Sequence, residues 1–190
     1  FLDGSDTLTL TAKVDKGHWI HFNSAGGSYV APQFVTGNTI PPADPARPGF
    51  SFEGWYEQSE NRFTFGSPLT SNITLTAHWK SNTSTKYTVI HWQEKADESG
   101  WSLHETETKT GRTGAQTAAA AKSYDGFTPM GFAQEMIKAN GSTVVKIFYT
   151  RNSYLLTYKD SLSAGVYASQ TYKYGAAVTA IADPTKTGYT

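Results

Sequence analysis

Hydrophobic and polar residues alternate along several stretches of this chain. In the clearest stretch, Ile73, Leu75, Ala77 and Trp79 are separated by threonine and histidine. A period of two puts one row of side chains on the buried face of a sheet and the other row in solvent. The chain is therefore predicted to be mainly β. Strands are expected at 8–14, 19–22, 73–79, 87–92, 144–149 and 154–158.

Tight turns are expected between these strands. Gly26-Gly27 and Asn140-Gly141 suit such turns, because glycine and asparagine tolerate positive φ. The stretch 97–100, Asp-Glu-Ser-Gly, is predicted to be the turn of a hairpin that begins with the strand at 87–92.

Short helices are also expected. The run 115–122 holds four consecutive alanines with a glycine just beyond it, which predicts a helix. One-turn helices are expected at Asp44-Pro45 and Asp183-Pro184, because aspartate caps a helix and proline fits its first position. The overall prediction is a mainly β or α+β fold.

The sequence repeats itself. Thr-Leu-Thr-Ala occurs at 9–12 and again at 74–77, and Ala-Asp-Pro occurs at 43–45 and again at 182–184. Each unit opens with an aromatic-rich strand and later reaches a glycine, an aromatic residue and a hydroxyl residue in succession. Four parts are predicted from these matches. They are the tail of a preceding repeat (1–14), a whole repeat (15–80), a related module (85–152) and the head of a further repeat (153–190).

The pattern is cut at both ends, so the chain is expected to be a piece of a longer protein. The head at 153–190 stops before any closing strand and should not bury a complete core alone. One hypothesis is that the structural unit is out of register with the sequence repeat. Another is that 1–14 pairs with 153–190 of a neighbouring chain by strand addition.

Residues 21–79 resemble a known repeat family. The resemblance rests on the segments 22–27 (Phe-Asn-Ser-Ala-Gly-Gly), 42–45 (Pro-Ala-Asp-Pro), 49–50 (Gly-Phe), 52–56 (Phe-Glu-Gly-Trp-Tyr) and 73–79. Their order and spacing resemble the Listeria–Bacteroides repeat, the B-type repeat of internalin B. Residues 86–152 look like the mucin-binding-protein-type modules that often alternate with such repeats, on the strength of 87–92, 103–108, 111–114, 126–127 and 144–149.

These resemblances imply a fold, a location and a role. Both families are described as β-grasp, ubiquitin-like folds, in which a small sheet curls over a helix. They imply an extracellular position on the bacterial cell surface and a spacer or adhesive role without catalysis. The expected architecture is thus a tandem array of small β-grasp modules that contact neighbouring repeats of the same chain.

Charge and composition remove several function classes. Lys plus Arg equals Asp plus Glu, 16 each, so no net field attracts nucleic acid and no nucleic-acid partner is expected. The chain has no cysteine, which removes disulfides and thiolate chemistry. No apolar run approaches the length of a membrane span, so no membrane insertion is expected from this segment.

Readable catalytic motifs and cofactor motifs are missing, so the chain is predicted not to be an enzyme and to hold no cofactor. Histidines such as His78, His91 and His104 are expected at exposed strand positions, without the neighbours that a zinc site needs. A weaker alternative is a cation site in an acidic patch. That patch would consist of Glu94, Asp97, Glu98, Glu105 and Glu107.

Aromatic residues are the remaining signal for binding. Trp55, Tyr56 and Trp79 are expected in the core. Trp92 and Trp101 flank the predicted hairpin and are the candidate ligand contacts, with cross-strand packing as the alternative.

Three functions are consistent with the sequence. The first is a structural or adhesive stalk segment of a bacterial surface protein. The second is a module, centred on 86–152, that binds host glycans or extracellular proteins, for which an exposed patch around the two tryptophans would be evidence. The third is an accessory module of a surface glycosidase.

Overall fold

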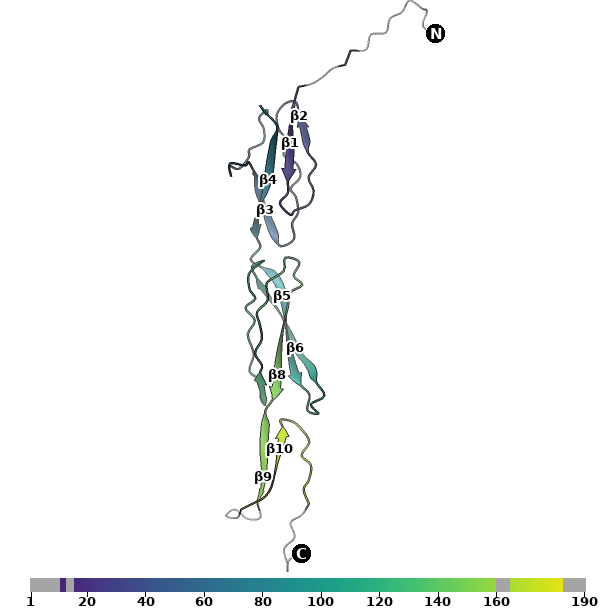
Figure 1. Ribbon diagram of the computed structural model, residues 1–190, viewed down its shortest axis with the longest axis vertical. Helices are drawn as coiled ribbons and strands as arrows, with labels where there is room; N and C mark the ends of the chain where they lie inside the picture. Colours follow the sequence, from purple (N-terminus) through teal and green to yellow (C-terminus); the bar gives the residue numbers. More distant parts are fainter. Residues whose placement is uncertain (1–10, 13–15, 160–164, 183–190) are drawn as a thin grey trace, which may run out of the picture. The chain divides into compact units, whose positions relative to one another are not determined.

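The computed structural model describes residues 11–12, 16–159 and 165–182. These residues form ten β-strands and no helix, which confirms the mainly β prediction (Figure 1). The chain divides into two compact units, residues 1–81 and 82–190. Across the described residues, no helix has the length and hydropathy needed to span a membrane.

The first unit holds a four-stranded sheet in the order β2-β1-β4-β3 (Figure 1). Its strands are β1 (His18–Asn23), β2 (Gln33–Val35), β3 (Phe50–Tyr56) and β4 (Ile73–Ser81). The first strand pairs in parallel with the last, from Ile20↔Ile73 to Asn23↔Thr76, and the other two pairings are antiparallel. The predicted strands at 19–22 and 73–79 are therefore present.

One face of this sheet carries the core of the first unit. Ile20, Trp55, Leu75 and Ala77 are buried there. Phe63, Phe65 and Leu69 from the connection before β4 pack onto them, as does Val30 from the connection between β1 and β2. The connections before β3 and before β4 are tied together by Thr39, whose backbone N–H donates to Ser67 O at 3.0 Å and whose carbonyl accepts from Gly66 N–H at 3.0 Å.

The second unit repeats this plan with longer strands. Its four-stranded sheet has the order β6-β5-β8-β7, so the first strand again lies between its hairpin partner and the closing strand. The strands are β5 (Thr85–Glu94), β6 (Trp101–Gly111), β7 (Phe127–Pro129) and β8 (Val144–Arg151). β5 and β8 pair in parallel from Thr88↔Val144 to Gln93↔Tyr149. The core includes Tyr87, Val89, Ile137, Ile147 and Tyr149.

The helix predicted at 115–122 is wrong. This segment crosses the core face of the sheet in an extended form, and 134–137 runs beside it. Thr117 N–H donates to Glu135 O and Ile137 N–H donates to Ala115 O, both at 2.8 Å. Burial alternates along it, because Thr117 and Ala119 are buried while the next residue after each is exposed. The alanines therefore serve as small strand residues whose backbone groups bond to a neighbouring segment.

The one-turn helix predicted at Asp44-Pro45 is also wrong, since 44–47 is irregular and leads into a turn before β3. The strand predicted at 8–14, apart from 11–12, and the helix at Asp183-Pro184 lie outside the described residues. The β-grasp form stays unconfirmed, because extended segments cover the sheet where a helix was expected.

The predicted turns are present. At Ser24–Gly27, Gly27 N–H donates to Ser24 O at 2.9 Å and Gly26 has a φ of 89°. The hairpin turn between β5 and β6 closes with Lys95 N–H donating to Gly100 O at 2.8 Å. At Asn140-Gly141, the glycine has a φ of 75°.

The repeated glycine–aromatic pair marks the same turn in both units. Phe50 N–H donates to Arg47 O and Phe127 N–H donates to Tyr124 O, both at 3.1 Å. The preceding glycines, Gly49 and Gly126, have φ values of 74° and 77°. Only glycine adopts this conformation without strain, which accounts for the repeat of the residue type.

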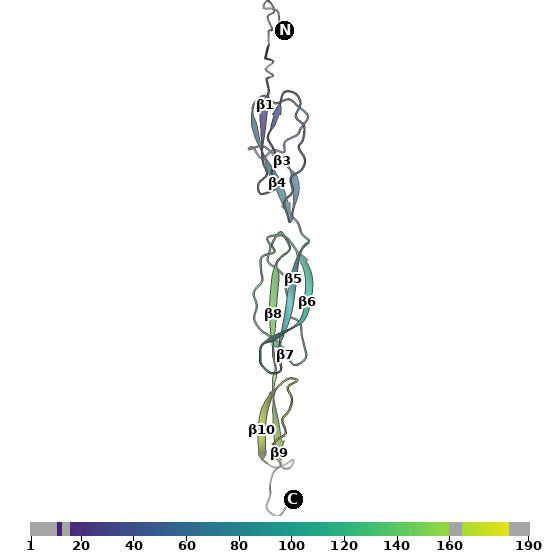
Figure 2. The ribbon, with the colours of Figure 1, turned by 90° about the vertical axis from the view of Figure 1, so that its right-hand side faces the viewer.

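A hairpin follows β8 in the second unit (Figure 2). It consists of β9 (Ser153–Lys159) and β10 (Val166–Lys173), which pair antiparallel. The turn after β10 returns to the preceding sheet, because Tyr174 N–H donates to Asn152 O at 2.8 Å. Arg151 donates from Nη1 to Tyr174 O at 2.5 Å and from Nε to Glu94 O at 2.7 Å. Where burial is described, no residue of β9 or β10 is fully buried.

We predict that Gly126→Ala destabilises the second unit. A Cβ at Gly126 would lie 2.1 Å from Cγ of Tyr174, and the φ of 77° is unfavourable for alanine. The expected loss in free energy of unfolding is roughly 2–4 kcal/mol, measured by urea denaturation. Gly141→Ala is the matched control, because its φ is 75° and the nearest atom is 3.5 Å away. Equal losses in the two variants would contradict a role for the Tyr174 contact.

Candidate functional site

The predicted ligand contacts Trp92 and Trp101 meet around Phe148. The Trp92 and Phe148 rings are stacked with centroids 6.4 Å apart, and Trp101 lies edge-on to Phe148 at 4.9 Å. Trp92 and Phe148 alternate along their strands with buried residues, so they lie on the face of the sheet opposite the core. Both tryptophans are half-buried, and Leu103 beside Trp92 is 55% exposed. Their role in binding stays a prediction.

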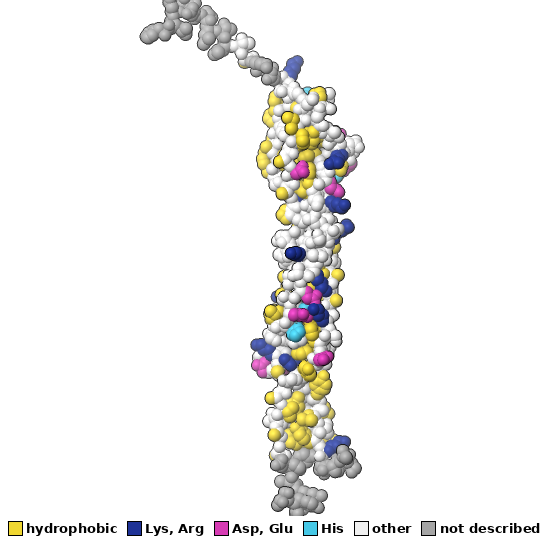
Figure 3. Space-filling view, turned by 180° about the vertical axis from the view of Figure 1, so that it is seen from behind, with side chains coloured by type: hydrophobic (Ala, Val, Ile, Leu, Met, Phe, Trp, Pro, Cys, Tyr) yellow, Lys and Arg dark blue, Asp and Glu magenta, His cyan; other side chains and the backbone are white. Residues whose placement is uncertain are grey.

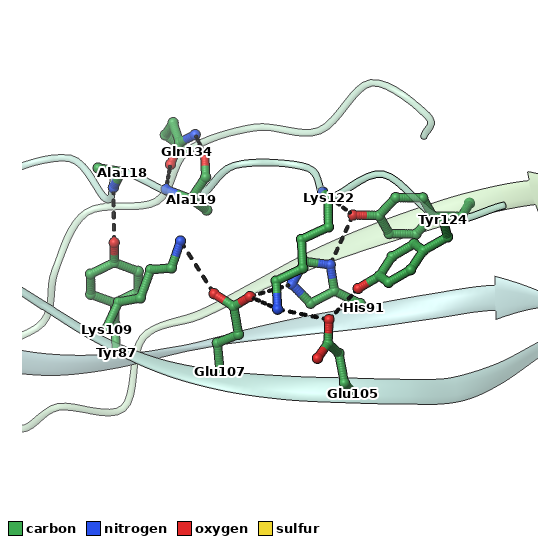
Figure 4. Close-up of polar contacts among 11 residues, drawn as sticks. Tyr87, His91, Glu105, Glu107, Lys109, Ala118, Ala119, Lys122, Tyr124 and Gln134 are labelled. Carbon is green, nitrogen blue, oxygen red and sulfur yellow. Dashed lines mark hydrogen bonds and ion pairs between the residues drawn. The ribbon is translucent and has the colours of Figure 1, made fainter. Parts of the chain in front are cut away.

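A cluster of polar side chains lies on the other face of the same sheet (Figure 4). His91 is the last buried residue of β5, and its side chain is 0% exposed. Its cross-strand partner on β6 is Glu105, and Glu107 is paired with Val89. The pair after His91↔Glu105 is Trp92↔Leu103, so His104 is skipped in the register of the two strands. This irregularity leaves Glu105 opposite His91.

The prediction that His91 is an exposed strand residue without acidic neighbours is wrong. Its Nε2 lies 3.6 Å from Oε1 of Glu107, and its Nδ1 is 2.8 Å from the hydroxyl of Tyr149. One ligand atom from each of His91, Glu105 and Glu107 can be chosen so that all lie within 4.8 Å of one another. Of the predicted acidic patch, Glu105 and Glu107 belong to this group. Glu94 instead accepts from Arg151, and Asp97 accepts from Ser99 in the hairpin turn.

Lys122 completes the cluster from the covering segment at 115–124 (Figure 4). Its Nζ donates to Oε1 of Glu105 at 2.8 Å and also forms an ion pair with Glu107. Its backbone N–H donates to the hydroxyl of Tyr149 at 2.9 Å, much as Ala118 N–H donates to the hydroxyl of Tyr87 at 3.1 Å. Two buried tyrosines of the sheet therefore hold the covering segment by its backbone.

The environment of the cluster fixes the charges of its members. Burial lowers the pKa of His91, so the imidazole is neutral near pH 7 despite the carboxylates beside it. Hydrogen bonds from Lys122 and from the Tyr124 hydroxyl lower the pKa of Glu105 to about 2. The hydrogen bond from Lys122 is also the largest cause of the lowered pKa of Glu107. The same pairs raise the pKa of Lys122, so its ammonium and both carboxylates are charged.

Figure 3 shows charged and histidine side chains gathered on the second unit above the β9–β10 hairpin, and hydrophobic side chains gathered on the hairpin itself. The exposed hydrophobic residues of the hairpin include Tyr154, Leu155 and Val166. The side chains of Lys122, Glu105 and Glu107 are 41%, 36% and 18% exposed, whereas His91 is fully buried.

The first unit carries an open groove that sequence reasoning did not identify. It has a volume of about 1070 Å³ and is lined by 57–60 and by Asn72, Ile73, Thr74, Thr76 and His78. The His78 ring stacks on Tyr56 with centroids 3.9 Å apart, and its Nε2 lies 3.2 Å from Oε2 of Glu60. The expected core residue Tyr56 is therefore only partly buried, whereas Trp55 is buried as expected.

The chain contains two related four-stranded modules. Each of them begins with an antiparallel pair of strands, and the β9–β10 hairpin that follows is a third such pair. The protein is therefore built of repeated small β modules. A comparison with protein families matches residues 18–78 and 154–190 to the Listeria-Bacteroides repeat domain, more than half of the chain. The chain belongs to this repeat family, and the resemblance seen in residues 21–79 is confirmed. No curated protein matches the sequence.

Membership places the chain in a class of proteins. The Listeria-Bacteroides repeat occurs in bacterial surface proteins, so this chain is a repeat segment of that surface or extracellular class. The module between the two matched stretches is not covered by the family match. Its resemblance to mucin-binding-protein modules stays a prediction.

We predict that Tyr149→Phe destabilises the second unit by roughly 1–3 kcal/mol. The change removes the hydroxyl that pairs with His91 Nδ1 and accepts from Lys122 N–H, and it leaves polar groups in the interior without partners. The free energy of unfolding, measured by urea denaturation, is the readout. Tyr154→Phe, at a position 52% exposed, is the control and should change it little. If the two variants were equally stable, the hydroxyl of Tyr149 would have no structural role.

Proposed function

We propose that this chain is a non-catalytic, load-bearing spacer in a bacterial surface protein. The observation that carries the proposal is the parallel pairing of the first and last strands in both complete modules. A chain that enters through the first of two parallel strands and leaves through the second enters and exits at opposite ends of the sheet. Each module therefore advances the chain by about the length of a strand.

The same pairing determines how tension acts on a module. Pulling on its two ends draws β5 and β8 in opposite directions along their shared ladder, so its hydrogen bonds are loaded together. The ladder joins six residue pairs in the second unit and four in the first. A load shared among several hydrogen bonds resists rupture better than a load that opens them one at a time.

We predict that the second unit resists force applied along β5 and β8 more than force applied across β5 and β6. The chain has no cysteine, so introduced cysteines give unique attachment points. The double variant Lys86→Cys, Ser153→Cys loads the parallel ladder in shear. The positions changed in the two double variants, 86, 110 and 153, are all exposed. Lys86→Cys with Thr110→Cys opens the antiparallel β5–β6 ladder from one end, where these residues are paired.

Single-molecule pulling of the whole chain is the measurement, and the first variant should rupture at a force several-fold higher than the second. Equal rupture forces in the two geometries would contradict the load-bearing role. Circular dichroism of both variants verifies that the folds are unchanged.

A second candidate function is adhesion through the aromatic group Trp92, Trp101 and Phe148. The observation that favours it is the position of this group on the sheet face opposite the core, next to exposed Leu103. Tryptophan rings that are partly exposed can stack on sugar rings or fill a pocket of a protein partner. Host glycans and extracellular proteins are the partners to test.

We predict that, if the chain is adhesive, Trp101→Ala reduces its binding to a glycan or extracellular-matrix array at least tenfold. Trp19→Ala, at an exposed tryptophan of the first unit, is the matched control and should bind as the unaltered chain does. The absence of binding by the unaltered chain, or equal binding by all three proteins, would contradict adhesion through this group.

A further inference from the structure

The cluster of His91, Glu105 and Glu107 has the composition of a metal site. An imidazole and two carboxylates are a donor set that suits zinc and related transition-metal ions, whereas calcium and magnesium prefer oxygen donors alone. All three residues lie on two neighbouring strands, β5 and β6, whose register brings one donor atom of each within 4.8 Å of the others. The sheet itself therefore holds the donors together.

The buried imidazole supplies an independent observation. Nε2 of His91 has no hydrogen-bond partner, although the side chain is 0% exposed. It is directed at Oε1 of Glu107, 3.6 Å away. Two donors bound to one ion at about 2.1 Å in tetrahedral geometry are about 3.4 Å apart, close to this separation. The unpartnered nitrogen and the carboxylate are thus already spaced for a shared ion.

Neighbouring hydroxyls orient the donors. The Tyr149 hydroxyl is bonded to Nδ1 of His91. In the tautomer that binds an ion, Nδ1 carries the proton and donates it to this hydroxyl, and the Nε2 lone pair is directed at Glu107. The Tyr124 hydroxyl donates to Oε1 of Glu105. Hydrogen bonds of this kind fix the rings and carboxylates of metal sites in their binding orientation.

Lys122 shows that a cation is already accommodated between the two carboxylates. Its ammonium does not satisfy Nε2 of His91, which therefore remains without a partner. The Lys122 side chain is 41% exposed, whereas its backbone is bonded separately to Tyr149. The side chain can therefore turn into solvent without releasing the covering segment.

We propose that His91, Glu105 and Glu107 bind a divalent transition-metal ion of the zinc type, which displaces the Lys122 ammonium. The ion would gain the nitrogen donor that the ammonium leaves unused, and a water molecule would complete its coordination on the side that Lys122 vacates. The bound ion would join β5 to β6 through side chains. This inference does not depend on the load-bearing role.

Lysines limit the affinity of the site. Lys122 competes for both carboxylates, and Lys109 Nζ lies 3.2 Å from Oε2 of Glu107. Removal of the competing charge should therefore favour the metal ion. We predict that Lys122→Met tightens zinc binding roughly tenfold, because an ammonium no longer competes for the carboxylates.

The experiment is a titration of the untagged full chain with Co²⁺, followed by visible absorption, and with Zn²⁺, followed by calorimetry. The unaltered chain and Lys122→Met should each bind one equivalent, and tetrahedral Co²⁺ should give its intense visible bands. Bound Zn²⁺ should also raise the thermal midpoint of the second unit as its concentration increases. His104→Ala, at an exposed histidine next to Glu105 on β6, is the matched control and should bind as the unaltered chain does.

Variants of the donors provide the decisive comparison. His91→Gln should abolish binding, and Glu105→Gln should weaken it at least tenfold. Glu105 is 36% exposed, so Glu105→Gln keeps the test valid if His91→Gln fails to fold, as circular dichroism would reveal. Lack of binding by Lys122→Met would overturn the proposal. Binding by the unaltered chain that Glu105→Gln leaves unchanged would also overturn it, because the ion would then lie elsewhere.

Discussion

Parallel pairing between the first and last strands is the constraint on which the rest of each module depends. Antiparallel neighbours can be joined by a tight turn, as β5 and β6 are, but parallel neighbours require a long connection. In both units, that connection contains the hairpin partner and the third strand, and it crosses the core face on the way. The same pairing fixes where the chain enters and leaves the module, so it also determines the direction in which tension acts.

The connection must satisfy its own backbone while it covers the core, because buried N–H and C=O groups without partners are costly. A helix would satisfy them internally, and the alanines at 115–122 favour one by intrinsic propensity. Here the neighbouring segment at 134–137 and the hydroxyl of Tyr87 supply the partners instead. The strands at 19–22, 73–79, 87–92, 144–149 and 154–158, the turns and the repeats could be predicted because they depend on local alternation and on glycine, whereas β2, β3, β7 and β10 were not predicted. The helix prediction failed because the extended form is stabilised by partners about 20 residues away along the chain. Helix propensity does not account for such partners.

The polar cluster shows a similar limit for the site. Alternation along β5 predicts that His91 shares a face with Tyr87 and Val89, but Ile90 and Trp92 make the opposite row equally hydrophobic, so the buried row cannot be chosen from the pattern. The carboxylates reach His91 through an irregularity at His104, and Lys122 reaches it through the misjudged segment. The grouping of Trp92 with Trp101 required only the hairpin, and that part was predictable.

A comparison of the two complete modules indicates why a polar site occurs in one of them. The core-facing row of β1 ends at Phe22, whose ring packs against Trp55 with centroids 4.7 Å apart, whereas the last buried residue of β5 is His91. Phe22 and Trp55 close the end of the core with hydrophobic contacts alone. In the second module, a neutral buried imidazole, two tyrosine hydroxyls and an ammonium close it with hydrogen bonds and ion pairs. Hydrophobic closure depends little on the exact placement of its neighbours, whereas polar closure loses stability for each buried donor or acceptor that has no partner. Because Nε2 of His91 has no hydrogen-bond partner, an ion bound at this end of the second module would complete the network of polar contacts there rather than disturb it.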